Sequence, residues 1–181
     1  MNRFPIAATG LVLALTLLLS ACGAKTQGTG AKVGMHIDAA LEFAIEYPLN
    51  WEKIRTLPYR SGRGEVRWSD PAHRARAMIV SSEPAASANE SPEQHLETMR
   101  QRFPGLELTL KETKTFPAGE ALHVMGFTSR TNIELYLFSS EQRRFAVIFT
   151  APAEEMNEFS AAFKEIIESF LMLSSSNSAT T

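Results

Sequence analysis

The sequence predicts an α+β domain in which an antiparallel β-sheet of about six to eight strands is sandwiched by helices, in α/β/α layers. Several segments alternate apolar and polar residues, which is the pattern of a strand with one buried face. Three later segments are apolar at nearly every position, so both of their faces need cover. A strongly amphipathic helix follows the last of these segments and can cover one side of the sheet.

Residues 1–21 have the features of a secretory signal peptide. Arg3 supplies a positive charge, residues 4–19 are almost purely apolar, and small residues follow. A basic start, an apolar stretch and small residues, in this order, are typical of exported proteins. We therefore expect residues 1–21 to be removed during export.

The signal peptide ends in a lipobox. Leu19, Ser20 and Ala21 place a branched apolar residue and two small residues before Cys22, the only cysteine of the chain. The motif resembles the processing site of bacterial lipoproteins. That resemblance implies a diacylglyceryl group on the Cys22 thiol, cleavage before Cys22, and acylation (palmitate) of the new amine. Cys22 is thus the predicted lipid attachment site, and its acyl chains are the predicted contact with the membrane.

Two other interpretations of this segment are weaker. An uncleaved transmembrane helix needs ~20 apolar residues, whereas this run is at the short end of that range and contains Pro5 and Gly10. An ordinary signal peptide would require the chain's only cysteine to fall on the lipobox position by chance. With one cysteine no internal disulfide can form, so the hydrophobic core must stabilise the fold.

The rest of the chain divides into three parts. Residues 22–37 begin with the lipidated cysteine and continue as small, polar, glycine-rich residues, which predicts a flexible tether. Residues 38–173 carry the strand and helix patterns and form the predicted domain, which is long enough to bury a core of its own. Residues 174–181 are rich in serine and predict a disordered tail.

The first half of the domain predicts four strands. Residues 41–47 alternate large apolar side chains with small or acidic ones, as a half-buried strand does. Three further short strands are expected. One begins at Trp51, one includes Val66 and Trp68, and one spans residues 77–80. Together they predict one part of an antiparallel sheet.

A helix is expected after these strands. Ser91 is the predicted cap, Pro92 takes the first helical position, and Gln94 completes a capping box. Pro104 is expected to stop the helix. One face is marked by apolar residues at helical spacing: Leu96, Met99 and Phe103.

The second half predicts a one-sided strand followed by a meander. Residues 106–110 alternate leucine with polar residues, so one face should be buried. Residues 121–127, 133–138 and 145–149 are the three apolar segments, joined by short polar turns. The closing helix carries one apolar stripe: Met156, Phe159, Phe163, Ile166, Ile167 and Phe170.

Charge is distributed unevenly along the chain. The formal net charge of −2 argues against a nucleic-acid-binding protein, which would be basic overall. Basic residues nevertheless outnumber acidic ones between residues 52 and 76. Arg60, Arg63 and Arg67 of this stretch form a predicted binding surface for lipid phosphates or an acidic partner. The alternative is a solvated loop with scattered charges.

No residue pattern marks a catalytic or metal site. The four histidines do not stand at metal-ligand spacing from one another or from the cysteine. No serine lies in a nucleophile-elbow motif, and no pair of carboxylates can be named as general acid and base. His123 lies in an apolar strand and is interpreted as a packed or solvent-facing imidazole. No cofactor is expected.

Two stretches resemble the PsbP-like (Mog/PsbP) superfamily. Residues 43–51, with the pattern Phe-x-Ile-x-Tyr-Pro-x-x-Trp, resemble its opening signature, and residues 145–170 resemble its closing strand and helix. The likeness covers roughly residues 38–173. It implies an antiparallel sheet between helices and a role in binding, and it provides no catalytic residues. Photosystem function does not transfer with it, because a fold does not imply a function.

These observations favour a membrane-anchored, non-enzymatic module that binds or stabilises an envelope protein complex. The alternative is a carrier for a lipid or small apolar ligand, with a pocket between the sheet and the Phe-rich helix. A small enzyme with a site built from scattered residues is the third hypothesis. Gly23, rather than Asp, after the predicted lipidation site resembles the sorting state of outer-membrane lipoproteins, and this implies an outer membrane location facing the periplasm if the host is Gram-negative.

Overall fold

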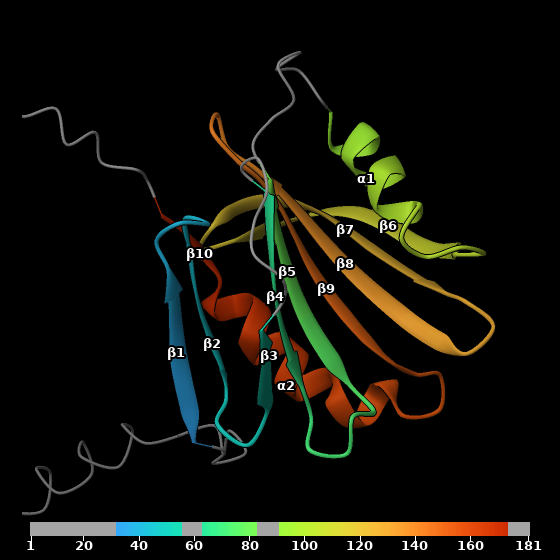
Figure 1. The fold of residues 1–181 in the computed structure, drawn as a ribbon. Helices are drawn as coiled ribbons and strands as arrows, with labels where there is room; N and C mark the ends of the chain where they lie inside the picture. The colour runs from blue at the N-terminus through green and yellow to red at the C-terminus, as the bar shows by residue number, and fades with distance from the viewer. Residues whose placement is uncertain (1–31, 56–62, 83–90, 174–181) are drawn as a thin grey trace, which may run out of the picture. The chain divides into compact units, whose positions relative to one another are not determined.

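The computed structural model describes residues 32–55, 63–82 and 91–173 (Figure 1). The predicted signal peptide, the predicted lipid attachment site Cys22 and the predicted tail lie outside these ranges. The elements of the described ranges are β1 (Val33–Asp38), β2 (Phe43–Pro48), β3 (Glu52–Arg55), β4 (Arg63–Ser69), β5 (Arg76–Ser82), α1 (Pro92–Arg100), β6 (Glu107–Phe116), β7 (Gly119–Phe127), β8 (Thr131–Ser139), β9 (Arg144–Pro152), α2 (Met156–Ser169) and β10 (Leu171–Met172).

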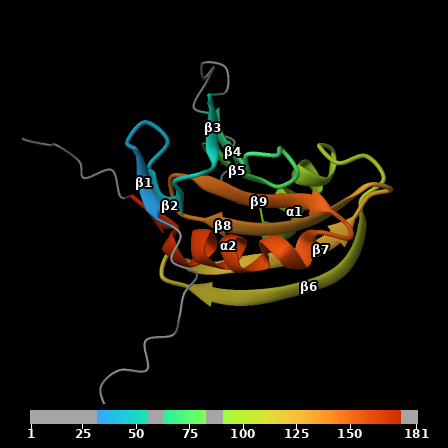
Figure 2. The ribbon, with the colours of Figure 1, turned by 90° about the horizontal axis from the view of Figure 1, so that it is seen from below.

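The strands form two antiparallel sheets. A seven-stranded sheet has the order β3-β4-β5-β9-β8-β7-β6, and a three-stranded sheet has the order β1-β2-β10. Helix α1 packs on one face of the larger sheet, and α2 packs on the other face together with the smaller sheet (Figure 2). The predicted α+β class, with an antiparallel sheet between helices, is confirmed.

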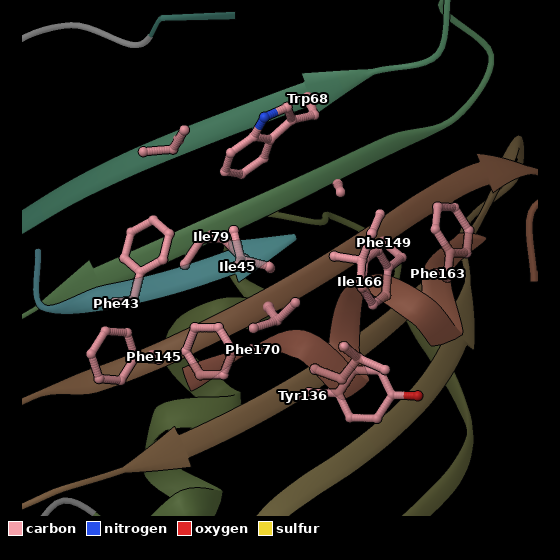
Figure 3. Packing of buried hydrophobic residues seen from close by; sticks show 14 of the residues in the cluster. Phe43, Ile45, Trp68, Ile79, Tyr136, Phe145, Phe149, Phe163, Ile166 and Phe170 are labelled. Carbon is pink, nitrogen blue, oxygen red and sulfur yellow. The ribbon is translucent and has the colours of Figure 1, made fainter. Parts of the chain in front are cut away.

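The core between α2 and the sheet is built from aromatic side chains. Phe163 of α2 stacks on Phe149 of β9 with ring centroids 4.6 Å apart, and Trp51 meets Phe163 edge-on at 6.1 Å. Figure 3 shows the closely packed members of this cluster: Phe43, Ile45, Trp68, Ile79, Phe145, Phe149, Phe163, Ile166 and Phe170. Because each fully buried large apolar side chain contributes ~1.5–3 kcal/mol, α2 is a main source of the fold's stability.

The core on the other face is smaller and aliphatic. The predicted cap is present, since the Ser91 hydroxyl accepts from the Gln94 amide at 3.3 Å and the Gln94 side chain accepts from the Ser91 amide at 2.7 Å. Leu96 and Met99 of α1 then pack on buried residues of the sheet: Val80, Leu122, Val124, Ile133, Leu135, Leu137, Ala146 and Ile148. With nine residues, α1 covers only part of this face.

The domain begins earlier than predicted. Residues 33–37, assigned above to the tether, form most of β1, which pairs with β2 along its whole length. The prediction was wrong because the usual alternation is inverted here: Val33, Met35 and Ile37 face outward, and His36 packs inward against Phe43. A strand with its apolar side chains outside does not show the pattern expected of a half-buried strand.

Two further boundaries differ from prediction. Helix α1 ends at Arg100 instead of continuing to Pro104, because the Arg102 and Phe103 amides bond three residues back and tighten the chain into turns. Strand β6 is not one-sided: a register shift between Leu108 and Leu110 pairs them with adjacent residues of β7, so they face opposite sides of the sheet. Leu108 is consequently exposed.

Candidate functional site

The structure separates the three arginines of the predicted binding surface. Arg63 and Arg67 lie four residues apart on the same face of β4, whereas Arg60 lies outside the described residues. Arg63 is exposed at the start of the strand, and Arg67 is half-buried near its middle. Of these three arginines, Arg67 lines a pocket.

This pocket, called the arginine pocket below, lies on the α1 side of the large sheet where the short helix leaves the strands uncovered. Its volume is about 310 Å³, which is the lower end of the range for small-ligand sites. Strands β4, β5, β8 and β9, the segment after α1 and the β7–β8 turn line it with Arg67, Arg76, Met78, Arg102, Phe103, Thr128, Thr131, Ile133, Ile148 and Thr150.

Glu65 orients two of the three pocket arginines. Its carboxylate oxygens accept separately from Arg67 and from Arg102, and Arg102 Nη2 also lies 3.9 Å from the sulfur of Met78. Arg76 is exposed and makes no hydrogen bond or ion pair with the other described residues. Three guanidinium groups against one carboxylate leave the pocket with net positive charge.

The floor of the pocket is apolar. Ile148 and Ile133 are buried in the sheet, and Met78 and Phe103 pack against them at the sides. Hydroxyl groups of Thr131 and Thr150 stand on neighbouring strands at the same end, where Ile133 pairs with Thr150. The arrangement suits an anionic group carried on an apolar stem, since arginine binds carboxylate or phosphate through a fork of donors.

Sequence reasoning missed Arg102 as a site residue and counted Arg76 only as part of the basic stretch. Arg67 pairs with Met78 across the β4–β5 hairpin. Arg76 lies two residues before Met78 on the same face of β5, so it comes close to Arg67. Arg102 arrives from the segment after α1, far away in the sequence. No local sequence pattern predicts that Arg102 reaches the pocket, because its position depends on how α1 packs on the sheet.

A second cluster of polar residues, called the His123 cluster, lies on the α2 face of β6, β7 and β8. His123 is 1% exposed. Its Nδ1 lies 3.0 Å from Glu112 Oε1, its Nε2 lies 2.8 Å from Glu134 Oε1, and its ring stacks on Tyr136 at 4.5 Å. The Tyr136 hydroxyl donates to the same Glu134 oxygen at 2.5 Å. The sequence left a packed or a solvent-facing imidazole open, and the structure shows the packed one. Its two carboxylate partners were not predicted.

The His123 cluster shifts the acidity of its members. Burial opposes ionisation of Glu134, but hydrogen bonds from His123 and Tyr136 outweigh it and hold the Glu134 pKa below its usual range. Hydrogen bonds from His123 and Lys114 lower the pKa of Glu112. Burial and the bond to Glu134 raise the pKa of Tyr136 far above normal. The cluster is therefore a buried hydrogen-bonded network that links β6, β7 and β8.

Neither cluster has the geometry of a reactive centre. His123 faces a carboxylate at each ring nitrogen, so neither nitrogen is free to meet a substrate, and it does not line the arginine pocket. In the described ranges, no three His, Cys, Asp or Glu side chains converge as metal ligands. The arginine pocket contributes charge and hydroxyl donors but no paired nucleophile and base.

The pocket predicted for the carrier alternative is filled. It was expected between the sheet and the Phe-rich helix, where Phe159, Phe163 and Phe170 are instead buried in continuous aromatic packing. Among the described residues, no helix is long and apolar enough to cross a membrane.

Comparison with known proteins defines the fold. No protein-family model matches this chain, and no curated protein sequence matches it significantly. Among solved structures, cyanobacterial PsbP (CyanoP) from Synechocystis sp. PCC 6803 superposes with a TM-score of 0.59, over 85% of this chain and 98% of that protein, at 13% sequence identity. The domain has a PsbP-like fold.

A second solved structure is similar to a lesser degree. LpqN of Mycobacterium tuberculosis, described as involved in cell envelope biogenesis, has a TM-score of 0.49 over 82% of this chain and 88% of its own length, at 13% identity. At 13% identity the likeness to CyanoP speaks to architecture alone, and it confirms the fold implied by residues 43–51 and 145–170. The activity must be argued from the site.

Proposed function

We propose that the protein is a lipid-anchored, non-enzymatic interaction module of the cell envelope, whose arginine pocket receives an acidic group of a partner protein. The arginine pocket carries this proposal. It combines three guanidinium groups, of which Arg76 is unpaired among the described residues, with an apolar floor. Arginine beside apolar and aromatic side chains is characteristic of protein interfaces.

The geometry favours binding over turnover. Arg67 and Arg102 are already oriented by Glu65, so little conformational freedom is lost when an anion binds between them. The pocket lies on a sheet face rather than in an enclosed cavity, and its ionisable groups are arginines, which do not exchange protons near neutral pH. Recognition of a carboxylate is the chemistry that such a group of side chains performs well.

The anchor supplies the second half of the proposal. The lipobox Leu19-Ser20-Ala21-Cys22 supports export and acylation, and Gly23 supports retention at the outer membrane of a Gram-negative host. Two or three acyl chains bind a bilayer far more firmly than a single chain. The domain would then meet its partner within the envelope at a raised local concentration.

In-cell crosslinking with mass spectrometry tests this function. The native chain is compared with Cys22→Ser, which removes the anchor, and with Arg76→Glu, which reverses the unpaired pocket charge. Lys164→Glu on the exposed side of α2 is the matched charge-reversal control. We expect a discrete partner with the native chain and the control, and its loss in the other two variants. A partner retained by Arg76→Glu would contradict the role of the pocket. An anionic amphiphile bound to the purified protein, with no protein partner, would mean instead that the arginine pocket holds a small ligand.

A further inference from the structure

Strand β1 presents an apolar face outward. Within the described ranges it is an edge strand that pairs with β2 alone, and its side chains at alternate positions are exposed by 47% at Val33, 61% at Met35 and 62% at Ile37. The opposite face of the strand packs inward, with His36 against Phe43 and Trp68. Exposed apolar side chains that gather on one face, rather than being scattered singly, indicate a contact surface.

The face extends across all three strands of the small sheet. Ile37 pairs with Ala44 of β2, and Ala44 pairs on its other side with Leu171 of β10, which is 43% exposed. Ile37 and Leu171 therefore flank Ala44 on one surface, with Met35 and Val33 continuing it along β1. This set, Val33, Met35, Ile37 and Leu171, is called the β1 patch. Glu46, which pairs with Met35, marks its charged border.

The chain itself leads from the β1 patch to the predicted anchor. Ten residues, 23–32, separate Cys22 from Val33, and they are small, polar and glycine-rich. A flexible chain of this length has a root-mean-square span of roughly 18 Å, and even fully extended it reaches only about 36 Å. Val33 is both the first residue of β1 and a member of the patch, so an anchor at Cys22 would keep the patch within about 36 Å of the bilayer.

We propose that the β1 patch docks on the bilayer surface to which Cys22 is anchored, so that the outer face of the three-stranded sheet rests on the membrane. The inference rests on the lipid anchor proposed above. The short tether makes docking an intramolecular step, which favours contact even though four side chains are too few for firm binding alone. Lys32, exposed beside Val33, would add attraction to anionic headgroups.

This orientation has a consequence for the arginine pocket. The β1 patch belongs to the three-stranded sheet, while the pocket lies on the α1 face of the seven-stranded sheet, away from the face that packs with the small sheet. Figure 1 shows the strands β1 and β2 and the helix α1 at different sides of the large sheet. Docking through β1 therefore leaves the pocket free of the membrane. One surface would hold the domain on the lipid while the other meets the partner.

Depth-dependent fluorescence quenching tests the docking. When Cys22 carries lipid, a cysteine introduced by Ile37→Cys is the only free thiol and can be labelled with an environment-sensitive dye. The lipid-processed protein is reconstituted into vesicles of phosphatidylethanolamine and phosphatidylglycerol, with and without headgroup-level spin-labelled lipid. Thr109→Cys is the matched control, because Thr109 is exposed on β6, an edge strand of the large sheet that does not belong to the small sheet. Ile37 is exposed, so its replacement leaves the core intact.

We expect a blue shift and a loss of emission with spin-labelled lipid at residue 37, and neither change at residue 109. If both positions behave alike while the protein floats with the vesicles, the docking is wrong and the anchor stands. If the protein stays in the aqueous fraction, the anchor fails and the docking fails with it. A concentration-dependent shift at residue 37 without lipid would assign the β1 patch to contact between two copies and overturn the membrane proposal.

Discussion

The two faces of the seven-stranded sheet are covered in different ways. On one face, the fourteen residues of α2 pack an aromatic stripe against β9 and the small sheet, and this side is closed. On the other face, the nine residues of α1 cover the β8 region and leave the strands near β4 and β5 open. The arginine pocket occupies the place that a longer helix would fill.

Under the proposed function, one face of the sheet would serve stability and the other would serve recognition. The closed face concentrates the large buried side chains, so substitutions there should act on folding. The open face contains charged side chains over a thin apolar floor, so substitutions there should act on binding. The predictions below use the free energy of unfolding to test this division, from the largest expected loss to the smallest.

The largest loss is expected on the closed face. Phe163→Ala removes a buried ring that stacks on Phe149 and contacts Trp51, and such truncations cost about 3–5 kcal/mol. Urea unfolding measures the change. Phe103→Ala, which truncates a half-buried ring at the arginine pocket, is the matched substitution on the open face and should cost clearly less. Equal losses would show that the two faces do not differ as described.

The His123 cluster should make stability depend on pH. The folded-state pKa of Glu134 is depressed, so the carboxylate stabilises the fold above its unfolded pKa, about 4.3, and this contribution disappears as the pH falls through the folded pKa. We expect Glu134→Gln to lower the free energy of unfolding by on the order of 1–3 kcal/mol at pH 7, because the hydrogen bonds of Glu134 to His123 and Tyr136 are weakened. Between pH 6 and pH 3 the variant should also lose less stability than the native chain.

Glu120→Gln, at an exposed position of β7, is the control for that titration. Its unfolding curves should follow those of the native chain at every pH. If Glu134→Gln and the native chain kept the same separation from pH 6 to pH 3, the Glu134 carboxylate would not be the titrating group.

A smaller loss is expected at the start of α1. Ser91→Ala removes the acceptor for the Gln94 amide, and loss of an N-cap of this kind costs about 1 kcal/mol. The pocket residues Arg102 and Phe103 follow the other end of α1, so fraying of its first turn should leave the arginine pocket intact. Thermal unfolding together with partner capture separates the two effects, and a cost above that of Phe163→Ala would contradict the minor role given to α1.

The smallest loss is expected within the arginine pocket. Arg76→Glu should change stability by no more than about 0.5 kcal/mol, as is usual for exposed positions without a partner. The same substitution should abolish capture of the partner. Urea unfolding and quantitative crosslinking of one preparation check both statements, and a destabilised variant would mean that Arg76 supports the fold instead of recognition.

Most strands and both described helices could be predicted because the spacing of their apolar residues matches the side chains that the fold buries. The capping box at Ser91 and the stripe from Met156 to Phe170 are read directly from spacing, and the structure contains both. Strand β1 could not be predicted in the same way. Its apolar residues face outward and its inward positions are Gly34 and His36, so burial and hydrophobicity disagree along it.

The two polar clusters depend on register, which the sequence does not specify. His123 meets Glu112 because β6 and β7 pair in the register set beyond the bulge at Leu108–Leu110, and it meets Glu134 through the pairing of β7 with β8. A shift by one residue would turn each side chain to the other face. The arginine pocket in addition requires Arg102 to arrive from the end of α1, which follows from tertiary packing alone.

Site-specific photo-crosslinking from the two faces tests most directly the claim that the arginine pocket is the recognition surface. A photoreactive amino acid is placed in the native chain at Thr131, which lines the pocket, or at Lys164, which is exposed on α2. After irradiation of living cells, we predict one discrete protein adduct from position 131 and none from position 164. An adduct from position 164 alone, or the same adduct from both positions, would contradict the account.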